Sequence, residues 1–137
     1  MTTTLEDHKA TVRRFIDALN VRDIDTAVAC LAEDFAFRAA PWAGGTIGRD
    51  GARRRLTEHL ARFPDLHFEL QDIFGEGDKV AIRRVWTATH TASLAGEVPT
   101  HRKIQGLHIE HWRFRDGRVA ETWVCSIMPP EVTGEGR

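Results

Sequence analysis

The first sixty residues carry apolar positions at helical spacing, interrupted by polar breaks. One stripe predicts a helix over 5–19, and its members are Leu5, Val12, Phe15, Ile16 and Leu19. Thr4 and Asp7 precede the stripe in the arrangement of a capping box. A shorter stripe predicts a second helix over 25–31, and Asp50 is expected to cap a third helix that ends at Phe63. A short strand over 35–37 and a glycine-rich loop over 40–45 lie between the second and third helices.

After Pro64 the pattern changes to the two-residue alternation of strands. Four long strands are expected, joined by turns at 75–78 and 116–117 and by a loop at 95–100. One face of the second of these strands collects Val80, Ile82, Arg84, Trp86, Ala88 and His90. The tail over 129–137 has little to bury and is expected to be flexible. Helices segregated from an antiparallel meander predict an α+β fold in one domain over 1–137.

The last two strands form a predicted hairpin whose loop is Asp116-Gly117, a pair suited to a type I′ turn. A two-residue loop would pair Arg115 with Arg118, Trp112 with Glu121, Glu110 with Trp123 and His108 with Cys125. One face would then hold His108, Glu110, Trp112, Phe114, Val119, Glu121, Trp123 and Cys125. Because this face is aromatic yet carries ionisable groups, it is typical of a pocket wall.

Composition narrows the classes of partner. The chain has 137 residues, a formal charge of −1 and 42% hydrophobic residues, which argues against nucleic acid as a partner. The run Arg53–Arg55 is interpreted as a solvated helix face. No apolar stretch is long enough to cross a membrane, and no leader-like segment is visible. Two cysteines form no disulfide framework, so a cytoplasmic location is expected.

The candidate chemistry is proton transfer. His108 and Glu110 lie ~6–7 Å apart along one strand, and Glu121 would be a diagonal neighbour. Burial and a second carboxylate are expected to raise carboxyl pKa values, while a histidine exchanges protons near neutral pH. Plainer roles remain open. Glu110 would then pair with Arg84, His108 would be a wall residue without chemistry, and Glu121 would be solvated.

Tryptophans suit a flat aromatic ligand. The expected substrate-binding residues are Phe15, Trp42, Arg84, Trp86, Trp112 and Trp123. The chain has no tyrosine, so oxyanion donors would be His108, Arg84, indole N–H groups or backbone amides. A metal set built from His108 and Glu110 with His90 or His101 is disfavoured, because the expected helices argue against a pure β-barrel and the sequence has no His-x-His pair. The sequence also contains no phosphate loop or dinucleotide fingerprint, so no metal and no nucleotide cofactor is expected.

Several strings, in order and spacing, resemble the nuclear transport factor 2-like superfamily and, within it, the SnoaL-like polyketide cyclases. They are Phe63-Pro64-Asp65-Leu66, Gly75-Glu76-Gly77-Asp78-Lys79-Val80-Ala81, Thr89-His90-Thr91, Pro99-Thr100 and the stretch from Phe114 to Trp123. The resemblance runs from Leu5 to about Ile127. It implies a cone, in which a strongly bent sheet packs on three helices around an apolar cavity. It also implies cofactor-free chemistry and a homodimer formed through the convex sheet face.

The resemblance places the polar pair of the penultimate strand at His108 and Glu110. The aspartate that cyclase relatives carry near the end of the last strand is absent here, where Val124, Cys125, Ser126 and Ile127 stand. The expected function is ring closure on an apolar, polyketide-type intermediate, with Glu110, His108 and Glu121 as catalytic candidates. The alternatives are an epoxide hydrolase or epoxide-opening cyclase, an isomerase, or a non-catalytic module that binds a small ligand.

Overall fold

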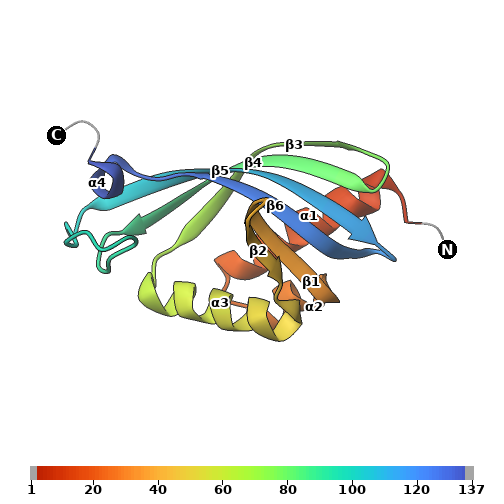
Figure 1. Cartoon of the computed structure of the whole chain (residues 1–137), viewed down its shortest axis with the longest axis horizontal. Helices are drawn as coiled ribbons and strands as arrows, with labels where there is room; N and C mark the ends of the chain where they lie inside the picture. The colour runs from red at the N-terminus through yellow and green to blue at the C-terminus, as the bar shows by residue number, and fades with distance from the viewer. Residues whose placement is uncertain (1–2, 135–137) are drawn as a thin grey trace.

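The computed structural model describes residues 3–134, except for the side chains at positions 43 and 44. Figure 1 shows a curved sheet with helices packed below it. The helices are α1 (Leu5–Asn20), α2 (Ile24–Ala29), α3 (Gly48–Arg62) and α4 (Pro130–Thr133). The strands are β1 (Leu31–Ala40), β2 (Ala43–Thr46), β3 (His67–Glu76), β4 (Lys79–Thr89), β5 (Lys103–Arg115) and β6 (Arg118–Ile127). This confirms the predicted α+β class.

The six strands form one open, mixed sheet in the order β2-β1-β6-β5-β4-β3. β1 pairs with β6 in parallel, and every other neighbouring pair is antiparallel. The predicted antiparallel meander is therefore only four of the six strands. The expected short strand over 35–37 is part of the longer β1. The second half of the expected glycine-rich loop pairs back onto β1 as the start of β2.

Helix α1 follows its sequence signals closely. Thr4 and Asp7 form both hydrogen bonds of the capping box, with the Thr4 hydroxyl accepting from the Asp7 amide and the Asp7 carboxylate accepting from the Thr4 amide. At the other end, the Asn20 side-chain amide donates to the carbonyl of Phe68 and accepts from its N–H. This two-bond contact fixes the end of α1 against β3, so the helix spans the concave side of the sheet.

The predicted start of α3 was wrong, and α2 ends at Ala29 rather than at the expected residue 31. Asp50 does not cap α3, because the helix begins at Gly48, whose φ of 66° turns the chain in from β2, and Asp50 falls in its first turn. The first residues of the tail were expected to have little to bury, but they pack against the rest of the fold. Pro129 is buried, and α4 follows it and ends at Gly134. Positions 135–137 of the expected flexible tail lie outside the described residues.

The hairpin turn was predicted correctly, but the register beyond it was not. Asp116 and Gly117 have φ angles of 52° and 78°, and Arg115 pairs with Arg118 as expected. A β-bulge then leaves Ala120 without an opposite residue, because Phe114 pairs with Val119 while Arg113 pairs with Glu121. The bulge allows the consecutive residues Val119 and Ala120 both to be buried.

A one-residue shift moves every later side chain of β6 to the other face. The observed partners of Trp112, Glu110 and His108 are Thr122, Val124 and Ser126. The predicted pairings with Glu121, Trp123 and Cys125 were therefore wrong. Those three side chains lie on the convex face, and the face toward the helices carries the three partners instead.

Candidate active site

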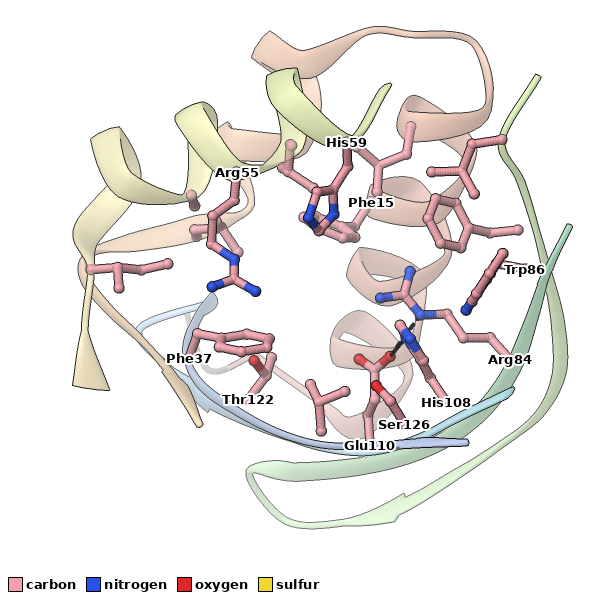
Figure 2. Close-up of a pocket in the computed structure, with 18 of the residues that line it drawn as sticks. Phe15, Phe37, Arg55, His59, Arg84, Trp86, His108, Glu110, Thr122 and Ser126 are labelled. Atoms are coloured by element: carbon pink, nitrogen blue, oxygen red, sulfur yellow. Dashed lines mark hydrogen bonds and ion pairs between the residues drawn. The ribbon is translucent and has the colours of Figure 1, made fainter. Parts of the chain in front are cut away.

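A cavity of about 350 Å³ lies between the concave sheet, α1 and α3. Its volume is within the range of small-molecule sites. Figure 2 shows the cavity roofed by α3 and floored by the sheet, with Phe15 behind and Trp86 at one side. Its lining is mostly apolar and aromatic, including Phe15, Leu19, Phe37, Leu56, Trp86, Leu94 and Trp112.

Polar groups cross the cavity floor in a row over three strands. Arg84 on β4 lies opposite His108 on β5, and His108 lies opposite Ser126 on β6. Glu110 follows two residues after His108 on the same face. Alternation along the strands thus places a guanidinium, an imidazole, a hydroxyl and a carboxylate side by side (Figure 2).

Glu110 is the anchor of this cluster and is 2% exposed. Its Oε2 accepts from Arg84 Nε at 2.6 Å, and its Oε1 accepts from Trp112 Nε1 at 2.9 Å. The Nδ1 of His108 lies 3.4 Å from Oε2, within ion-pair distance but without hydrogen-bond alignment. Both carboxylate oxygens are therefore held by donors supplied by the protein.

The electrostatics of Glu110 differ from expectation. Burial raises its pKa, but the Arg84 guanidinium and the His108 ring beside it outweigh burial and hold the pKa well below its usual range. The predicted upward shift was wrong because a buried cation accompanies the carboxylate. Glu110 is thus a fixed anion near neutral pH, suited to orienting its neighbours rather than to donating a proton.

Arg84 still has a free donor after pairing with Glu110. The residue is 9% exposed and its guanidinium lies 4.6 Å above the Phe68 ring, so its position is fixed. Its Nη1 is buried and has no hydrogen-bond partner among the described residues. Figure 2 shows this guanidinium above Glu110 and His108 at the cavity floor. A buried unsatisfied donor is costly, so an acceptor on a ligand would be strongly favoured here.

Helix α3 adds basic groups to the cavity that the sequence did not reveal. Arg55, His59 and Arg62 all line it. Burial lowers the pKa of His59, and the nearby charges of Arg55 and Arg62 lower it further. All three arginines of the run Arg53–Arg55 are exposed, as interpreted from the sequence, but Arg55 also lines the cavity, which was not expected. The signal was present in the spacing, because Arg55 falls in a stripe with Ala52, Leu56, His59 and Phe63.

The structure brings together six of the predicted site residues around the cavity, namely Phe15, Arg84, Trp86, His108, Glu110 and Trp112. The other three lie elsewhere. Trp42 is 88% exposed in the β1–β2 turn. Glu121 and Trp123 lie on the convex face because of the bulge, where Glu121 accepts from Arg38 at 2.7 Å and from the Trp123 indole at 3.0 Å. Sequence reasoning missed Thr122 and Ser126 for the same reason.

The metal set weighed from the sequence is not assembled. Across residues 3–134, no group of three or more His, Cys, Asp or Glu side chains is arranged to hold a metal ion. His90 is fully buried and occupied elsewhere, with Nε2 2.9 Å from Glu97 Oε2 and Nδ1 accepting from the Thr100 amide. Among the described residues, no helix is both long and apolar enough to span a bilayer.

Comparison with known proteins identifies the family of this chain. Residues 9–126 match the family model of the SnoaL-like polyketide cyclases. AclR of Streptomyces galilaeus, a proposed hydroxylase, is 27% identical with a TM-score of 0.82 over 96% of this chain and 85% of its own. IdmH of Streptomyces antibioticus, a proposed polyketide cyclase, is 31% identical with a TM-score of 0.74 over 87% of this chain and 91% of its own.

A proposed polyketide cyclase from Acidithiobacillus ferrooxidans shares the fold at 23% identity, with a TM-score of 0.77 over 98% of this chain and 96% of its own. The search of curated proteins returned no match. The family match covers most of the chain, and the open sheet packed on helices is the fold of its structural neighbours. The chain belongs to the SnoaL-like polyketide cyclase family, within the nuclear transport factor 2-like fold.

Proposed function

We propose that this protein is an enzyme that closes a ring in an apolar, polyketide-type carbonyl compound by proton transfer. His108 is the proton-transferring group, Glu110 orients and balances its ring, and Arg84 binds the carbonyl oxygen on which negative charge develops. The observation that supports this most strongly is the buried, unpartnered Nη1 of Arg84 beside His108 in an apolar cavity. Family membership supports a cyclase or hydroxylase-like activity at the coarser level.

The chemistry follows from the charges of the site. The Glu110 carboxylate lies 3.4 Å from Nδ1 of His108 and favours the proton on that nitrogen, which leaves the lone pair on Nε2. Nε2 removes a proton from the carbon next to the carbonyl bound at Arg84, and the electron pair moves onto the carbonyl oxygen as an enolate. The enolate carbon then attacks a second carbonyl of the same molecule. The proton held on His108 neutralises the new alkoxide, so no net proton is consumed.

Arg84 supplies the electrostatic part of this reaction. An enolate oxygen is more basic and more negative than a ketone oxygen, so a fixed guanidinium favours the transition state over the bound substrate. Glu110 prevents Arg84 from rotating away and keeps the local charge balanced before substrate binds. The aromatic walls, including Phe15, Trp86 and Trp112, exclude water from the enolate.

Proton abstraction can be measured without knowing the natural substrate. The probe is 2-acetonaphthone, a flat aromatic ketone with exchangeable methyl protons, incubated with the protein in D₂O. NMR follows the loss of the methyl proton signal. Wild-type protein is expected to accelerate exchange, and His108→Ala to reduce that acceleration by about 100-fold, the lower range of general-base contributions.

Glu110→Gln is expected to reduce the exchange rate as well, because the imidazole loses its orienting anion. His111→Ala is the matched control, since His111 is the adjacent histidine on β5 and faces the convex side. If wild-type protein exchanges no faster than His108→Ala, the proposal is wrong. Epoxide hydrolysis is one of the enzymatic alternatives. It requires an oxygen nucleophile, so incorporation of ¹⁸O from labelled water into the product would indicate that reaction instead.

A further inference from the structure

The cavity face of α3 carries a stripe of basic residues that the proposed reaction does not use. Arg55, His59 and Arg62 stand at positions i, i+4 and i+7, so they project from the same side of the helix. All three line the cavity, across from the polar row of the sheet. Figure 2 shows the Arg55 and His59 side chains descending from α3 into the cavity.

The Arg55 guanidinium is held in place by an aromatic ring, but its positive charge is not paired with any carboxylate of residues 3–134. Its guanidinium carbon lies 4.3 Å over the Phe37 ring, which holds the flat group against the cavity wall. No carboxylate pairs with it among the described residues. The contrast with Arg53, two residues earlier, is direct, because Arg53 pairs with Asp25 at 2.6 Å. Apart from the Phe37 ring, the Arg55 guanidinium has no hydrogen-bond or ion-pair partner in the described part of the chain, so its N–H donors are available to a ligand.

The charges around the cavity do not balance. The Arg84 and Glu110 charges offset one another across their 2.6 Å ion pair. Arg55 and Arg62 remain as positive lining groups, and neither has an ion-pair partner within residues 3–134. The lowered pKa of His59 keeps that ring neutral, which limits repulsion along the stripe. An apolar cavity with two unopposed guanidinium groups at its rim favours an anionic ligand.

We propose that Arg55, assisted by Arg62, is a specificity-determining residue that binds a free carboxylate on the substrate. The preferred substrates are then apolar carboxylic acids rather than the corresponding esters or amides. The planar guanidinium matches a carboxylate in a two-bond arrangement. The acid end would lie under α3, and the reacting carbonyl would lie across the cavity at Arg84. This inference rests on the proposed function for the reacting end only.

Binding of a matched acid and ester tests the inference independently of turnover. The ligands are 2-naphthoate and methyl 2-naphthoate, titrated into the full-length protein at pH 7.5 by isothermal calorimetry. The variants are Arg55→Gln, Arg55→Lys and the control Arg54→Gln. Arg54 is the neighbouring residue of the same helix and does not line the cavity. Arg54→Gln therefore removes one positive charge from α3 without changing the cavity lining.

Wild-type protein is expected to bind the acid about fivefold or more tightly than the ester, as for an ion pair that solvent can reach. Arg55→Gln is expected to abolish this preference, Arg55→Lys to keep part of it, and Arg54→Gln to leave it unchanged. His108→Ala should also retain it, which separates this inference from the catalytic one. Equal affinity of the wild-type protein for both ligands, including no detectable binding of either, overturns the inference. So does a preference that survives in Arg55→Gln.

Discussion

Breaking the buried Arg84–Glu110 pair should destabilise the protein strongly. Glu110→Gln preserves the shape of the side chain and an acceptor for the Trp112 indole but removes the negative charge. The Arg84 side chain, 10% exposed, would then remain buried without an anion. Removing one partner of a buried pair typically costs about 3–5 kcal/mol, because the remaining charge is uncompensated. We expect Glu110→Gln and Arg84→Met each to lower the free energy of unfolding by about 3 kcal/mol.

The double variant distinguishes this explanation from a simple loss of contacts. Replacing both charged residues leaves no uncompensated charge, so the double variant should be more stable than the sum of the two single effects predicts, by about 2 kcal/mol or more. The convex face offers a matched control in Arg38 and Glu121, which pair at 2.7 Å with side chains 34% and 18% exposed. Arg38→Met and Glu121→Gln should couple by less than about 1 kcal/mol.

Urea unfolding followed by far-ultraviolet circular dichroism measures these energies, provided the slope with urea stays constant among variants. The pH dependence gives a second check. Because the folded state lowers the pKa of Glu110, the stabilisation is complete above the unfolded glutamate value, about 4.3, and is lost as pH falls toward the folded pKa. The stability difference between wild type and Glu110→Gln should therefore shrink below about pH 4.3. Equal coupling in the inner and outer pairs would refute this reasoning.

Two further predictions concern parts of the fold that shape the cavity. Gly106→Ala should lower the free energy of unfolding by about 1–3 kcal/mol, because a Cβ at this position would lie 2.4 Å from the Trp86 indole. The control in the same urea assay is Gln105→Ala, since the Gln105 side chain is exposed on the opposite face of β5. Glu97→Gln should speed amide hydrogen exchange over 93–97, measured by mass spectrometry, because the Glu97 carboxylate accepts from the amides of Leu94 and Ala95. An unchanged exchange pattern would show that these bonds do not order the loop.

The sequence predicted the elements whose signals are local. The capping box at Thr4, the turn at Asp116-Gly117 and the alternation along β4 all depend on residues close in the chain, and all three are observed. His108 and Glu110 were placed correctly because β5 alternates without interruption as far as Arg113. Their mutual position therefore did not depend on the pairing with β6.

The wrong predictions concern features that depend on residues far apart in the sequence, namely strand register and the charges around a buried group. The bulge at Ala120 is invisible in the pattern because Val119 and Ala120 are both apolar, yet it transfers Glu121 and Trp123 to the convex face. The run of three arginines obscured Arg55, although only that one lines the cavity. The pKa of Glu110 was expected to rise with burial, and the buried Arg84 reversed the direction.

Chemical rescue tests the central claim, that the imidazole of His108 transfers the proton, most directly. The His108 side chain is 21% exposed, so its removal opens a space that reaches solvent. In the deuterium-exchange assay, His108→Ala is expected to be slow and to recover rate as free imidazole is added, while His111→Ala stays at the wild-type rate with or without it. Exchange by His108→Ala at the wild-type rate before any imidazole is added would contradict the claim.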